Sequence, residues 1–138
     1  VFSEQLVLIA DRPYQALEVL MQQPLLIFSD GCGYRAKLTE WLRDSGIRPT
    51  KQMELGTLET TLGSVISGLG VAYVPYSAVQ HYEASGLIHC HELPEKYSAI
   101  ETVFIYREKD YLTPALEKFV ETIELTRHDA ISPFYRLD

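Results

Sequence analysis

The chain has few cysteines, no surplus of basic residues and no long apolar run, and each shortage excludes a class of protein. Its two cysteines, Cys32 and Cys90, are too few for a disulfide scaffold and fit a reducing cytosol. Twelve Lys and Arg face nineteen Asp and Glu, and the net charge of −7 argues against nonspecific DNA binding by this chain. No apolar run approaches bilayer length and no secretory signal opens the sequence, so we expect a cytoplasmic protein that contacts no membrane.

What the sequence does contain is enough apolar side chain for one packed core. Its 138 residues are 46% hydrophobic and 11% aromatic, which excludes intrinsic disorder and fits one compact domain. Apolar runs indicate the strands, and several of these runs are continuous, as in strands that are covered on both faces. We expect strands at 5–10, 25–28, 51–55, 71–74, 87–93 and 102–106.

Helices are expected where apolar residues recur at helical spacing. The expected helices cover 14–23, Tyr34 to a stop at Gly46, Thr57 to about Gly68, 77–84 and 113–124. The alternation of strands and helices predicts an α/β protein with a mixed, mainly parallel sheet and helices on both faces.

The most informative segment is Ser29–Gly33, a glycine-rich turn between a buried strand and a helix. Such a turn presents unpaired backbone N–H groups, which can hold a carboxylate or a phosphate. It is not a nucleotide-binding fingerprint, because the required spacing and a Lys-Ser/Thr pair are absent. The charge of Asp30 can also satisfy the helix end, so a ligand loop and a plain helix start both stay open here.

Gly56-Thr57 is a second junction of the same kind. Ligands collect at the carboxyl ends of strands in open α/β sheets, so we expect both junctions at one edge of the sheet. Thr57 is equally well explained as a helix cap and nothing more.

Candidate reactive side chains do not assemble into catalytic machinery. Cys32 lies at a helix start, where the dipole favours a thiolate, but Asp30 opposes that charge and a passive small residue is the better interpretation. In a strand only His89 and His91 of the His89-Cys90-His91 run share a face, and two ligands do not make a structural zinc site. We therefore expect no enzyme, no metal and no cofactor.

Two segments carry a family resemblance. "DGCGYRAKLTEWLRDSGIRP" and "ELGTLETTLGSVISGLGVAYVPYSAV" resemble the effector-binding domain of LysR-type transcriptional regulators. The matching positions are Gly31, Cys32, Tyr34, Arg35, Leu38, Trp41, Leu42, Gly56, Thr57, Glu59, Val65, Gly68, Leu69, Gly70, Val71 and Pro75. One departure is Ile66-Ser67, which replaces a pair of smaller residues.

The resemblance implies one lobe of a type 2 periplasmic-binding-protein-like fold. Residues 1–109 would form the second of two α/β lobes joined by crossing strands. Residues 110–138 would form a C-terminal helix and tail that return to a first lobe absent from this chain. The chain therefore looks like a fragment of a longer regulator.

The resemblance also implies a function. A small-molecule effector would sit in the cleft between lobes and reorient them, which changes how a homo-oligomer holds its DNA-binding domains on a promoter. DNA would be contacted only through an N-terminal helix-turn-helix outside this chain. The implied effector contacts are Ser29, Asp30, Gly31, Cys32, Gly33, Thr57 and Tyr73.

Two other classes of protein share this fold. The first is a lobe of a solute-binding protein. The 5′ end of the gene distinguishes the two classes, because it would encode a signal peptide in a solute-binding protein and a helix-turn-helix in a regulator. The second is an enzyme such as a prephenate dehydratase or a deaminase-like lobe, which no catalytic constellation in the sequence supports.

Overall fold

The computed structural model describes residues 2–14, 16–105 and 113–126. The chain divides into two compact units. The larger unit is Gln5–Ala99, and the smaller joins the first residues of the chain to those after Ala99. Each unit is described by itself.

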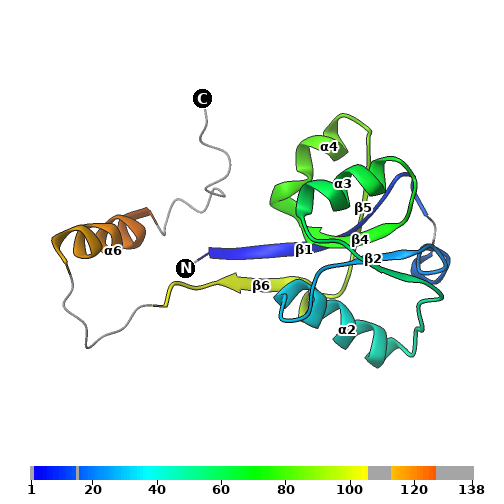
Figure 1. Cartoon of the computed structure of the whole chain (residues 1–138), viewed down its shortest axis with the longest axis horizontal. Coiled ribbons are helices and arrows are strands. Elements are labelled where there is room, and N and C mark those ends of the chain that lie inside the picture. The colour runs from blue at the N-terminus through cyan, green and yellow to red at the C-terminus, as the bar shows by residue number, and fades with distance from the viewer. Residues whose placement is uncertain (1, 15, 106–112, 127–138) are drawn as a thin grey trace. The chain divides into compact units, whose positions relative to one another are not determined.

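The described residues form one sheet and several helices (Figure 1). The strands are β1 (Phe2–Ala10), β2 (Leu25–Ile27), β3 (Gln52–Glu54), β4 (Val71–Pro75), β5 (His89–Glu92) and β6 (Ala99–Thr102). The helices are α1 (Leu17–Leu20), α2 (Gly33–Ser45), α3 (Leu58–Ile66), the 3-10 turn η1 (Tyr76–Ala78), α4 (Gln80–Ala84), α5 (Glu95–Ser98) and α6 (Pro114–Thr126).

The sheet has the strand order β3-β2-β4-β1-β5, and β6 pairs with β1. β2 runs parallel to β3 and β4, whereas β1 is antiparallel to β4 and β5. Leu8 of β1 lies opposite both Tyr73 of β4 and His91 of β5. The α/β class with a mixed sheet is confirmed. The direction of β1 was not evident from its residues, because a central strand is covered on both faces whichever way it runs.

Helices cover both faces of this sheet, as predicted: α3 and α4 lie on one face and α2 on the other (Figure 1). Because side chains alternate along a strand, neighbouring residues of β2 serve different faces. Leu26 joins the cluster under α3, which also contains Leu62 and Val65. Leu25 and Ile27 face α2, whose Leu38 and Leu42 line the same groove. The single tryptophan, Trp41, is buried on α2.

Several expected elements have different bounds in the structure. Only Leu17–Leu20 is helical in the expected helix 14–23, and the expected helix 77–84 is divided between η1 and α4. The last expected strand, 102–106, is wrong in position, because β6 covers Ala99–Thr102 and residues 103–105 form no strand. Tyr106 lies outside the described residues. No pattern in the sequence predicted α5.

In the smaller unit, α6 begins as its sequence predicts. Pro114 is its first residue, and the Leu116 N–H donates to Thr113 Oγ1 at 3.3 Å. No residue of α6 is buried, and the ring of Phe119 meets the ring of Phe104 edge-on at 5.8 Å between centroids. Among the described residues, no helix is long and apolar enough to cross a membrane.

Candidate functional site

The loop that follows β2 closes in a tight turn before α2. The Cys32 N–H donates to the Ser29 carbonyl at 3.3 Å, and Gly31 has a φ of 89°. A positive φ at the third position of a turn is the mark of a type II turn and favours glycine there. Ser29 and Asp30 are exposed, whereas Cys32 is half-buried. Gly31 thus shapes a turn that presents two polar side chains to solvent.

The first turn of α2 has no side-chain cap from its own N-cap residue. Cys32 occupies that position in an extended conformation and makes no capping hydrogen bond through its side chain. The Asp30 carboxylate pairs with Arg35 instead, at 3.0 Å. The start of α2 therefore keeps the positive end of its dipole facing the loop.

Arg35 fastens this loop to two strands. Its Nη1 donates to the Phe28 carbonyl at 3.0 Å and lies 3.1 Å from Glu54 Oε2 at the end of β3. The same nitrogen makes the contact with Asp30. One guanidinium therefore holds the end of β2, the loop and the end of β3 together. Its side chain is only 25% exposed.

Sequence reasoning named Arg35 only as a position of the family resemblance and missed this role. A signal was present, since a cation in the first turn of a helix opposes the helix dipole and requires anions nearby. Asp30 and Glu54 are those anions.

Thr57 is the N-cap of α3, as the sequence allowed. Its Oγ1 accepts the Thr60 N–H at 3.1 Å and donates to Thr60 Oγ1 at 2.9 Å. The hydroxyl is thus committed to the cap. Thr57 follows β3, and the Arg35–Glu54 pair ties the end of that strand to the loop after β2. Both junctions therefore lie at one edge of the sheet, as predicted.

Tyr73 lies in the middle of β4 and is 2% exposed. Its hydroxyl donates to the Tyr97 carbonyl at 2.8 Å, and burial raises the pKa of this phenol far above its ordinary value. Tyr73 also lines a narrow gap with Phe28, Tyr34 and Arg35, residues that flank the loop. Its hydroxyl is already bonded within the unit.

A larger groove, of about 320 Å³, opens between α2 and the edge formed by β2 and β3. Its lining includes Leu25, Ile27, Leu38 and Arg35. Residues 29–33 line neither this groove nor the gap that Tyr73 lines. The polar loop is thus separate from these two concave surfaces.

The histidines and the second cysteine of β5 have structural surroundings. His91 Nε2 accepts the Tyr14 N–H at 3.1 Å, and the two rings meet edge-on. Burial raises the pKa of the half-buried Cys90 thiol to about 12, so it stays protonated at neutral pH. Within the part of the chain that the structure describes, no three His, Cys, Asp or Glu side chains gather as a metal site requires.

The fold defines a class, because solved regulatory and effector-binding domains share it. The CcmR regulatory domain of Synechocystis PCC6803, solved in complex with 2-PG, matches with a TM-score of 0.72 and 14% identity, over 91% of this chain and 64% of that one. The effector-binding domain of QuiR, solved in complex with shikimate, matches with a TM-score of 0.69 and 17% identity, over 94% and 65%.

The sequence then gives the family. Residues 1–126 match the LysR substrate binding domain, and the chain belongs to that family. It is 52% identical over 124 residues to the HTH-type transcriptional regulator SoxR of Arthrobacter sp. (strain TE1826), covering 90% of this chain and 43% of that protein. It is 46% identical over 128 residues to the HTH-type transcriptional regulator CzcR of Bacillus anthracis, covering 93% and 44%. The family resemblance is confirmed, and the chain spans less than half the length of these curated relatives.

Proposed function

We propose that this chain is the effector-sensing part of a cytoplasmic transcriptional regulator, with the effector held at the Ser29–Gly33 loop. In this proposal residues 1–109 form the second of two lobes, and residues 110–138 return to the first. The names of the curated relatives, which are all transcriptional regulators, favour this function over a solute-binding lobe or an enzyme.

The observation that carries the proposal is the start of α2, which has no side-chain cap from its N-cap residue and lies beside a carboxylate paired with an arginine. Backbone N–H groups at a helix start attract anions, but a free Asp30 would repel them. Arg35, at 3.0 Å from Asp30, offsets part of that charge and shares the same nitrogen with Glu54. The loop is therefore suited to the carboxylate or phosphate of a small acid, with the exposed Ser29 hydroxyl as a further donor.

Separation of the loop from the groove and the gap described above supports a site that needs a second wall. Residues 29–33 line neither of these two volumes, and small-molecule sites bury most of their ligand. A first lobe facing the loop would supply the missing wall. Thr57 would then contribute by holding α3 in place, and Tyr73 through the residues flanking the loop, with which it lines the gap.

The mechanism we infer is a population shift. An effector that touches both lobes binds one of their relative orientations better than the others, and it shifts the equilibrium by that difference in affinity. In a homo-oligomer this reorientation alters how helix-turn-helix domains outside this chain engage a promoter.

A titration on the full-length protein that contains this chain tests the loop. A panel of small carboxylic and phosphorylated acids that includes shikimate and 2-PG is screened by thermal shift, and the stabilising compound is titrated by calorimetry. Ser29→Ala is expected to weaken its binding about tenfold, the effect of one hydrogen bond. Ser45→Ala, at the far end of α2, is the matched control and should bind as the wild type does. Equal affinities for both variants would contradict the proposed site.

A further inference from the structure

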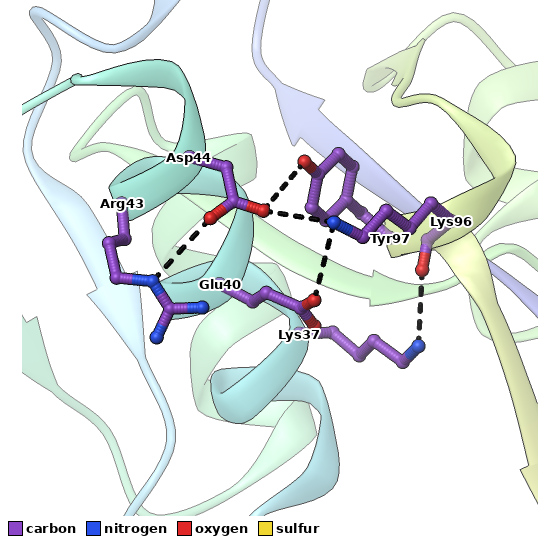
Figure 2. A network of polar contacts seen from close by, with 6 residues as sticks. All are labelled: Lys37, Glu40, Arg43, Asp44, Lys96 and Tyr97. Carbon is purple, nitrogen blue, oxygen red and sulfur yellow. Dashed lines mark hydrogen bonds and ion pairs between the residues drawn. The ribbon is translucent and has the colours of Figure 1, made fainter.

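Polar side chains fasten the short helix α5 to α2 (Figure 2). Asp44 Oδ2 receives two donors from α5: Lys96 Nζ at 3.1 Å and the Tyr97 hydroxyl at 2.9 Å. In the other direction, Lys37 Nζ donates to the Lys96 carbonyl at 3.1 Å. Lys96 also lies 3.7 Å from Glu40. We call these contacts the α2–α5 joint.

α5 is also bonded to the sheet and stands where the chain leaves the larger unit. The buried Tyr73 hydroxyl donates to the Tyr97 carbonyl at 2.8 Å. Ser98, the last residue of α5, is 4% exposed, and Ala99 begins β6. The larger unit ends at Ala99. The position of α5 therefore sets where β6 starts.

The N-terminal end of α2 carries the effector loop, held by Arg35. Arg35 and Asp44 are nine positions apart on one continuous helix of 13 residues, which corresponds to roughly 13 Å along its axis. A helix of this length moves as a rod, so a displacement at its first turn reaches the joint, which extends along α2 from Lys37 to Asp44.

We propose that α2 and α5 form a relay that transmits the state of the Ser29–Gly33 loop to β6, the strand by which the chain leaves this lobe. The inference rests on the proposed function, because it assigns the loop to the effector. The joint is suited to this role since it consists of exposed polar contacts, which are individually weak and can be exchanged without unfolding the core. A buried apolar contact at the same place would lock α5 instead.

Native-state hydrogen exchange on the 138-residue chain tests the relay without any effector. Arg35→Lys keeps the charge but loses the guanidinium fork, and Tyr97→Phe removes only the hydroxyl bonded to Asp44. Arg35→Lys is expected to speed exchange of the β6 amides about threefold, because α2 loses its fixed position. In the Tyr97→Phe background the same change should have less than half that effect. Without a relay, substitutions at two residues so far apart that share no partner would change the exchange rate independently, to within about twofold.

Arg48→Lys, an identical exchange on the exposed loop after α2, is the control and should leave β6 exchange as it is in the wild type. The amides of β4 report global unfolding and are followed in every sample. If Arg35→Lys does not fold, Glu54→Gln replaces it, since it removes the negative charge of one of the three partners of Arg35. Additive effects of the two substitutions, or no effect of the loop substitution on β6, would overturn the relay. Either result leaves the effector titration untouched, so failure of the relay is distinguishable from failure of the proposed function.

Discussion

At the scale of single residues, Gly70 is a glycine because its surroundings leave no room for a side chain. A Cβ at this position would collide with the carbonyl oxygen of Pro24 and lie 3.2 Å from Leu26 Cγ. Pro24 lies directly before β2 and Leu26 lies within it, and β2 pairs with β4, which begins directly after Gly70. The obstacle includes backbone and has no flexible end that can move aside.

Gly70→Ala is therefore expected to destabilise the chain by about 1–3 kcal/mol, the range for overpacking a filled core. The matched control is Gly63→Ala in α3, where an added Cβ meets nothing within 4 Å. That substitution should stabilise the helix by up to about 1 kcal/mol. Urea unfolding of both variants measures the difference. A Gly70→Ala variant as stable as the wild type would show that the Pro24 carbonyl moves freely.

His91 illustrates a different residue-level constraint. Its Nε2 accepts the Tyr14 N–H, while its buried Nδ1 has no hydrogen-bond partner among the described residues. Burial lowers the pKa of His91 below its ordinary value, and the nearby His89 acts in the same direction. Protonation would remove the acceptor for Tyr14, so the folded chain favours neutral His91.

The sign of the resulting pH dependence follows from this lowered pKa. Below about pH 6.5 the unfolded chain takes up a proton on His91 that the folded chain resists. The contribution of His91 to stability is therefore full above that pH and declines as the pH falls toward its folded-state pKa. Urea unfolding at about pH 8 and about pH 5.5 should show a loss for the wild type. His91→Gln, which keeps an acceptor near the Nε2 position, should lose less between the two pH values. An equal loss in both proteins would exclude His91 as the cause.

Among the helices and strands, the sequence predicted best those that begin or end at a residue with a capping or stop signal. Gly46 ends α2 in the left-handed conformation with a φ of 68°, as its position predicted, and Thr113 caps α6. The elements without such signals were misplaced. β6 was placed three residues too late because 103–105 is the more apolar run. α5 was missed because it is one turn long and is stabilised by side chains of α2 that lie far away in the sequence.

Substitutions of Thr57 distinguish its role as the cap of α3 from a role in ligand binding. Thr57→Ala removes the acceptor for the Thr60 N–H and should cost about 1 kcal/mol of stability. Thr57→Ser keeps the hydroxyl and should unfold at nearly the wild-type urea concentration. If Thr57→Ala is as stable as the wild type, the cap contributes nothing and the hydroxyl is better explained by ligand binding.

The same limit of local signals applies to the candidate site. The loop and both junctions were predictable, because a turn between a buried strand and a helix has a local signature. The Arg35 contacts were not, since Glu54 is 19 residues away and only the parallel pairing of β2 and β3 brings it close. The commitment of the Tyr73 hydroxyl to Tyr97 likewise depends on tertiary packing alone.

At the scale of the whole molecule, the acidic composition applies only to the residues of this chain. The net charge of −7 describes a chain that covers 43% of the SoxR relative and 44% of the CzcR relative. The charge argues against DNA binding by these residues, and it does not bear on the DNA contact that we propose for a longer regulator containing them. What this chain contributes, in our proposal, is one wall of an effector site.

That proposal has a direct quantitative consequence. If the Ser29–Gly33 loop is only one wall, an effector identified on the full-length protein gains most of its contacts from a lobe that the 138-residue chain does not supply. Calorimetry with the same compound on both proteins measures this difference. We predict binding by the full-length protein and affinity at least about a hundredfold weaker, or none, for the 138-residue chain. Equal, tight binding by the 138-residue chain alone would contradict the two-lobe site.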